Sequence, residues 1–166
     1  MAKDKTLEDL FYDTLKDIYF AERQILRALP KMARAAQSPD LKAGFEKHRG
    51  ETEGHVERLQ QIFELIGKRA QGKTCEAIQG IIAEGEEIME EFKGTVALDA
   101  GLISAGQAVE HYEIARYGTL KTWAQTLGHK EVVSLLDQTL QEETATDKTL
   151  SRLATTAANQ KASRAA

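Results

Sequence analysis

Acidic and imidazole side chains interrupt the apolar stripes of several helical segments in this sequence, and these residue types suit metal binding. In the segment RGETEGHVERLQQIFELIG, residues 49–67, the apolar stripe leads back from Leu59 to His55 and then to Glu51. Carboxylates with one or a few imidazoles form the ligand set that iron and manganese prefer. Each such interruption is therefore a candidate metal ligand.

The same exception occurs in the three other long segments. The candidates there are Glu22, Glu110, Glu113, Glu143 and Asp147. Each lies near the middle of its segment, so helices packed side by side would bring the candidates to a similar depth. Ionised carboxylates buried together are costly and repel one another, and two divalent cations would remove that cost. The pattern therefore predicts a site for two iron or manganese ions.

A simpler interpretation exists for each piece of this pattern. Glu22 alone could lie at the edge of its stripe and reach solvent. Glu51 and His55 could form an ordinary pair one turn apart on a helix surface. Glu143 and Asp147 could be two solvated acids. The metal interpretation is favoured because four segments make the same exception at matching depth.

Helical periodicity dominates the chain, and no segment alternates as a strand would. Long helices are expected from Thr6 past Met32 and over residues 38–67, 96–127 and 131–158, with a short one over 75–92. Pro30 is expected to kink or loosen the last turns of the first. This order predicts an all-α four-helix bundle whose long crossover carries an additional short helix. A solenoid is the alternative, but the sequence has no repeat of fixed period.

Composition sets further limits. A chain of 166 residues with 42% hydrophobic residues fits one soluble domain, here residues 1–158, with a frayed tail over 159–166. Its net charge of −4 gives no general reason to bind nucleic acid or anionic lipid. No apolar signal-peptide core or membrane-spanning stretch is found, so a cytoplasmic protein that does not enter membranes is expected.

The single cysteine, Cys75, excludes an intramolecular disulfide and any multi-cysteine metal site. It stands at the expected start of the short helix. No acid or base is near it in the sequence, so no catalytic role is assigned to it.

Three stretches carry a resemblance to a known family. YDTLKDIYFAERQILRALPKMA, ETEGHVERLQQIFELIGKRAQGKTCEAIQGIIAEG and AGQAVEHYEIARYGTL resemble the YciF-type stress proteins, which are bacterial ferritin-like proteins. The resemblance covers nearly the whole chain. It implies a ferritin-like bundle, a homodimer and a centre of two metal ions, together with a role in the stress response. It implies no particular reaction.

By this resemblance Glu22 and Glu110 correspond to the ligands of the first and third long helices. The remaining ligands depart from the wider ferritin pattern of Glu-x-x-His pairs. That spacing, ending at His55, would place Thr52 at the glutamate position, so Glu51 is the carboxylate available. In the last long helix Glu143 is followed by Asp147 and by no histidine, which argues against ferritin-type oxidase chemistry.

Four further residues have open roles. His48 lies two turns from His55 and is either an outer neighbour of the site or exposed. His111 is expected at the edge of the bundle or in a dimer contact. Tyr19 and Tyr117 either orient ligand carboxylates or are ordinary core tyrosines.

Three functions remain compatible with the sequence. The first is a redox protein whose two metal ions react with a small oxidant, peroxide or dioxygen. The second is a non-enzymatic dimeric structural or binding protein of the stress response, with a structural or vestigial metal site. The third, iron storage, is weaker, since nothing in the sequence identifies the interfaces of a hollow shell.

Overall fold

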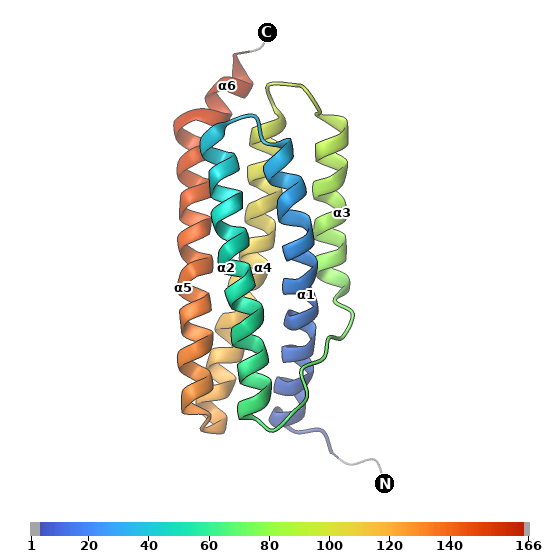
Figure 1. Ribbon diagram of the computed structural model, residues 1–166, viewed down its shortest axis with the longest axis vertical. Helices are drawn as coiled ribbons and strands as arrows, with labels where there is room; N and C mark the ends of the chain where they lie inside the picture. The colour runs from blue at the N-terminus through green and yellow to red at the C-terminus, as the bar shows by residue number, and fades with distance from the viewer. Residues whose placement is uncertain (1–3, 165–166) are drawn as a thin grey trace.

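The computed structural model describes residues 4–164, which form a bundle of four long helices with a shorter helix at its side (Figure 1). The helices are α1 (Leu7–Ala35), α2 (Pro39–Leu65), α3 (Glu76–Glu91), α4 (Leu98–Leu127) and α5 (Lys130–Leu153), followed by the π-helix η1 (Ala154–Ala158) and α6 (Asn159–Ser163). The described residues contain no β-strand. The predicted all-α fold, a ferritin-like four-helix bundle, is confirmed.

The long crossover runs from the end of α2 to the start of α4, at opposite ends of the bundle (Figure 1). A loop runs from the end of α2 along α1, and α3 spans the rest of the length of the bundle. Helix α3 packs against α1 and α4. The additional short helix therefore lies where the sequence placed it, within the crossover.

Side-chain caps explain where the first two helices begin. The Thr6 hydroxyl accepts a hydrogen bond from the Asp9 amide, and the Asp9 carboxylate accepts one from the Thr6 amide. The Ser38 side chain accepts from an amide in the first turn of α2. The Asp99 carboxylate of α4 accepts from the amides of Gln37 and Ser38 at 2.8 Å each. This buried carboxylate ties the α1–α2 turn to the start of α4.

Three local expectations can be compared with the structure. Helix α1 continues through Pro30 to Ala35. Cys75 caps α3, since its Sγ accepts a hydrogen bond from the amide of Ile78. Helical conformation continues beyond residue 158, through α6 to Ser163. Residues 1–3 of the expected domain and residues 165 and 166 of the expected tail lie outside the described residues.

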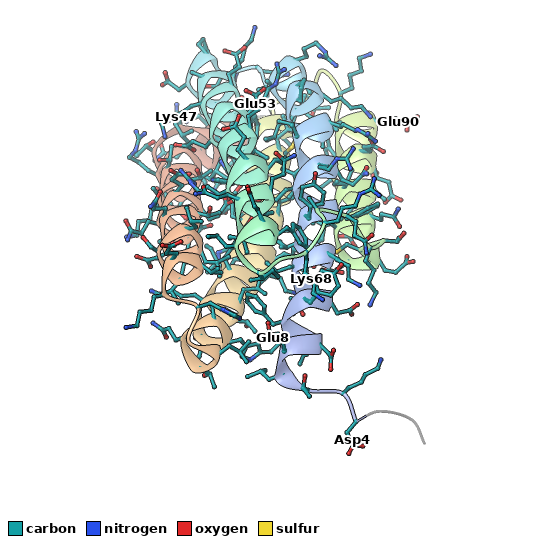
Figure 2. The ribbon with its side chains drawn as sticks, turned by 60° about the horizontal axis from the view of Figure 1, so that its bottom comes forward. Asp4, Glu8, Lys47, Glu53, Lys68 and Glu90 are labelled. Atoms are coloured by element: carbon teal, nitrogen blue, oxygen red, sulfur yellow. The ribbon has the colours of Figure 1, made fainter. Side chains whose placement is uncertain are left out.

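Apolar side chains from all five main helices fill the core, but charged side chains interrupt its middle. Charged residues on the outside, such as Glu8, Lys47, Glu53, Lys68 and Glu90, are exposed (Figure 2). Apart from Asp99, the buried polar and charged residues are Glu22, His48, Thr52, His55, Glu110, Glu113, Thr139 and Glu143. Among the described helices, none has the length and apolar character needed to cross a membrane.

Candidate metal centre

Six of these buried residues converge in the middle of the bundle as two overlapping groups. The first group is Glu22, His55, Glu113 and Glu143, and the second is His48, Glu110, Glu113 and Glu143. In each group, one potential ligand atom from every residue lies within 4.8 Å of the others. Glu113 and Glu143 belong to both groups. This geometry could hold two adjacent cations that share the carboxylates of Glu113 and Glu143.

Helical periodicity explains how four helices supply six side chains. His48 and His55 are seven residues apart on α2, almost two full turns, so both rings point into the bundle. Their ring centroids are 6.1 Å apart. Glu110 and Glu113 are three residues apart on α4 and share one face. Helices α1 and α5 contribute one carboxylate each.

The inward-facing atoms of this cluster have few partners. His55 Nδ1 lies 2.8 Å from Glu143 Oε1 and 3.3 Å from Glu22 Oε1, and His48 Nε2 lies 3.0 Å from Glu110 Oε1. None of these close contacts has the geometry of a hydrogen bond. Across the described residues, the buried side-chain nitrogen and oxygen atoms without a hydrogen-bond partner are Glu22 Oε2, His48 Nε2, His55 Nδ1, Glu110 Oε2, both Oε atoms of Glu113 and both of Glu143.

Such atoms are rare in folded proteins, because each one forfeits the hydrogen bonds that it makes in water. Here all of them lie on the six converging residues and face one another. Four carboxylates and two imidazoles are a donor set that fits iron or manganese. The residues present therefore fit a pair of divalent cations.

An outer carboxylate orients the ring of His55. Its Nε2 lies 2.8 Å from Oε2 of Glu142, on α5. Arg58 holds the same carboxylate with two hydrogen bonds, of 2.8 and 2.7 Å, and also donates to Thr139. A proton on Nε2 that is donated to Glu142 leaves the lone pair of Nδ1 facing the cluster.

The ring of His48 has a similar outer partner. Its Nδ1 lies 3.4 Å from Glu51 Oε2 and 3.2 Å from the Thr146 hydroxyl. Glu51 also forms an ion pair with Lys47, and its side chain is 22% exposed. Because Nδ1 faces these groups, Nε2 points into the cluster. Glu51 therefore contacts a candidate ligand from outside the two groups.

The two tyrosines with open roles differ in the structure. Tyr117 is fully buried, and its hydroxyl donates a hydrogen bond to Glu22 Oε1. Tyr19 instead accepts a hydrogen bond from Gln60 and packs edge-on against Phe63. Tyr117 therefore orients a carboxylate of the cluster, whereas Tyr19 is part of the apolar core.

Burial and mutual contacts shift the pKa values of the cluster. Burial disfavours the charged imidazoles, but the adjacent carboxylates outweigh it and raise the pKa of His48 to about 10 and that of His55 to about 11. Burial raises the pKa values of Glu110 and Glu113 well above the usual glutamate range. Burial also acts on Glu143, but its contacts with His55 and Glu110 outweigh that effect and lower its pKa. Without a cation, the cluster thus retains protons on several groups.

The structure brings together five of the seven residues predicted as ligands. These are Glu22, His55, Glu110, Glu113 and Glu143. It does not bring Glu51 or Asp147 into either group.

Asp147 points to the edge of the bundle. There its Oδ1 lies 3.1 Å from Nε2 of His111 and accepts a hydrogen bond from Gln107. His111 is 68% exposed, which agrees with both roles expected for it, at the bundle edge or in a dimer contact.

His48 is the residue that the sequence left open and the structure places in the cluster. Its spacing of seven residues from His55 was the available signal, because two side chains almost two full turns apart face the same way. Glu142, which orients His55, lies next to Glu143 in the sequence, and nothing in the apolar stripe distinguishes it from a solvated acid.

Comparisons with known proteins agree with this fold over most of the chain. Residues 6–163 match a family described as Domain of unknown function (DUF892). Protein YciF of Escherichia coli strain K12 is 45% identical over 159 residues, which are 95% of this chain and 96% of that protein.

Solved structures give the same result. The E. coli stress protein YciF has a TM-score of 0.89 at 44% identity, covering 95% of this chain and 99% of that one. YcfI from Rhodopseudomonas palustris has a TM-score of 0.87 at 45% identity, covering 91% and 97%. A Xanthomonas campestris protein, 22% identical with a TM-score of 0.70 and coverage of 90% and 92%, shares the fold. The chain thus belongs to the DUF892 family, as a YciF-type protein.

Proposed function

We propose that this protein holds two iron or manganese ions in the middle of its bundle and serves in the stress response. The observation that carries the proposal is the set of eight buried, unpartnered nitrogen and oxygen atoms on the six converging residues. A fold that buries so many polar atoms without hydrogen-bond partners in one place loses stability unless a ligand satisfies them. Divalent cations satisfy all of them at once.

The sharing of residues between the two groups suggests how the ions would be held. Glu22 and His55 would bind one ion, and His48 and Glu110 the other. Glu113 and Glu143 would bridge the two positions. When bound, such ions supply redox chemistry toward dioxygen or peroxide.

The protein's own residues would keep the ligands in place. Tyr117 holds Glu22 by a hydrogen bond, and Glu142 holds His55 while Arg58 holds Glu142. These outer contacts fix which ring nitrogen and which carboxylate oxygen face the cations.

The stress-response part of the proposal comes from the similar E. coli protein, which is described as a stress protein. A homodimer and a cytoplasmic location, implied by the family resemblance and the composition, belong to the same proposal. The native mass in solution tests the dimer, because one chain has a mass of 18.4 kDa.

The direct test is the metal content of tag-free protein purified without chelator, measured by elemental mass spectrometry. We expect about two iron or manganese ions per chain, as in bundles of this architecture. Glu22→Ala is expected to lower the content, whereas Glu57→Ala, at an exposed position of α2, keeps it. The proposal fails if all three proteins take up less than about a tenth of an ion after anaerobic loading with ferrous or manganous salt.

A further inference from the structure

A partly enclosed cavity of about 60 Å³ lies beside the cluster and touches only one of its two ends. His48 and Glu110 form part of its wall, whereas Glu22, His55, Glu113 and Glu143 do not. Apolar side chains from five helices make up much of the rest, namely Ile25, Met32, Phe45, Ile82, Val109 and Leu150. The two proposed cation positions are therefore not equivalent, since only the His48–Glu110 position adjoins an apolar space.

Glycine keeps part of this space open. Gly106 lines the cavity on α4, one turn before Glu110. A Cβ atom at this position would lie 3.2 Å from Leu150 Cδ1 and 3.4 Å from Phe45 Cε1, both also in the wall. A glycine inside a helix costs roughly 0.5–1 kcal/mol relative to alanine. At this position it leaves room that any side chain would fill.

Polar side chains also line the cavity: His48 and Glu110 at its inner end, and Lys31, Lys47, Glu51, Glu86, Thr146 and Thr149 elsewhere in the wall. His48 and Glu110 are each only 2% exposed, and His48 Nε2 and Glu110 Oε2 have no hydrogen-bond partner. At the solvent side, Lys31 and Glu86 form an ion pair of 2.9 Å between α1 and α3, and both are about half exposed. The cavity thus combines an apolar body with a buried polar inner end, where His48 Nε2 lies 3.0 Å from Glu110 Oε1.

From this arrangement we infer that the cavity binds a short, unbranched alkyl molecule with one uncharged polar end, such as a primary alcohol or aldehyde. Its polar end would lie beside the proposed cation position of His48 and Glu110. That this molecule is the substrate of the metal site rests on the proposed function. An ionic head group is disfavoured, because burying a charge in an apolar cavity costs far more than burying a hydroxyl or carbonyl group.

The size of the cavity sets the length of the ligand. A cavity needs roughly 10–15 Å³ to hold one water molecule, so about 60 Å³ leaves room for about four to six groups of that size. A methylene group has a size of the same order as a water molecule. A chain of about four to six heavy atoms therefore fits, and 1-pentanol is the matching probe.

The test measures binding of 1-propanol, 1-butanol, 1-pentanol and 1-octanol to the full chain, by calorimetric titration with and without bound metal and by methyl-resolved NMR on the metal-free protein. Each buried methylene contributes about 0.8 kcal/mol, which is about fourfold in affinity. We expect the affinity to rise by about that factor for each methylene up to 1-pentanol and to rise no further at 1-octanol. The shifts should occur at Ile25, Val109 and Leu150.

Two cavity-filling variants and a matched control complete the test. Gly106→Val and Ala28→Leu place atoms in the wall and should weaken 1-pentanol binding at least tenfold. Gly118→Val makes the same change on the same helix, where nothing lies within 4 Å of the added Cβ, and should leave binding unchanged. Ala28→Leu keeps the test valid if Gly106→Val disrupts the fold.

Metal content measured on the same preparations separates this inference from the proposed function. Two bound ions without saturable 1-pentanol binding would overturn the inference and leave the proposed metal site standing. Saturable binding without metal would retain the cavity as an alkyl site but overturn the dinuclear centre, and with it the substrate role. Equal weakening in Gly106→Val and Gly118→Val would show that binding occurs elsewhere, and the inference would fail.

Discussion

The imidazole rings of His48 and His55 lie with their centroids 6.1 Å apart, and each turns one nitrogen toward the shared carboxylates Glu113 and Glu143 and the other toward an outer carboxylate. Seven residues of one helix separate them, so a single element positions both rings. His55 belongs with Glu22 and His48 with Glu110. The two groups can therefore be tested separately by substitution of His48 or His55.

Replacing His48 should remove one ion and retain the other. His48→Gln removes a nitrogen from the second group only, so we expect the metal content to fall from about two ions per chain to about one. Elemental mass spectrometry on the folded variant measures this. His111→Gln is the control, since that ring is exposed and pairs with Asp147 instead. An unchanged content in His48→Gln would remove His48 from the ligand set.

Glu143 and Asp147 lie one turn apart on α5 and should behave differently. Glu143 belongs to both groups, so Glu143→Gln should lower the affinity for both ions. Asp147→Asn should retain full metal content, because that carboxylate contacts Gln107 and His111 at the bundle edge. Competition against a fluorescent chelator measures both affinities. Loss of metal in Asp147→Asn would restore that residue as a ligand.

Glu142, the outer carboxylate that contacts His55, should strengthen metal binding without being a ligand itself. Glu142→Gln removes the charge that orients the ring, and outer partners of this kind typically change metal affinity by 10–100-fold. Titration with ferrous or manganous ion under anaerobic conditions measures the change, and we expect the stoichiometry to stay the same. Glu57→Gln, at an exposed position, should have no effect. A change in stoichiometry in Glu142→Gln would contradict an orienting role.

The metal-free protein should lose stability as the pH rises above neutrality. The pKa values of His48 and His55 are raised to about 10 and about 11 in the folded state, against a usual value of 6.5. The folded state therefore binds more protons than the unfolded state between about pH 6.5 and 10. Their stabilising contribution is complete below pH 6.5 and is lost as the pH rises through that window. Thermal unfolding of the metal-free chain from pH 6 to 10 measures this.

Metal binding should release protons for the same reason. Without metal, the raised pKa values of His48 and His55, about 10 and about 11, keep both imidazoles protonated at neutral pH. Metal ligation requires neutral imidazoles, so the binding of two ions should release at least these two protons. Calorimetry in buffers with different ionisation enthalpies counts them. A release near zero would show that the cluster is already deprotonated before metal binds.

Replacing Glu113, a carboxylate that both groups share, should weaken metal binding and stabilise the metal-free protein. Glu113 is fully buried and has two unpartnered oxygens. Glu113→Met has a similar volume and removes a buried carboxyl group without a hydrogen-bond partner, which costs about 1–3 kcal/mol. We expect denaturation of the metal-free variant at higher urea concentration than the unaltered chain, and no further stabilisation by metal. Glu57→Met serves as the exposed control. A less stable metal-free variant would contradict this account of the cluster.

The sequence alone predicted the four long helices, the short helix in the crossover and five of the six converging residues. Apolar periodicity carries this information, since a stripe along a helix identifies the buried face and any charged residue within it. Glu22, for example, is identified by its apolar neighbours one turn away on each side, Ile18 and Ile25.

Only the tertiary structure decided between neighbours on the same helix. Successive residues of an α-helix are turned by about 100°, so on α2 His48 and His55 point within about 20° of one another while Glu51 lies about 40–60° to one side. On α5 Asp147 lies about 40° from Glu143. Differences of this size are set by how each helix rotates against its neighbours. Packing turned His48 and Glu143 inward and left Glu51 and Asp147 at the rim, which no pattern along one helix encodes.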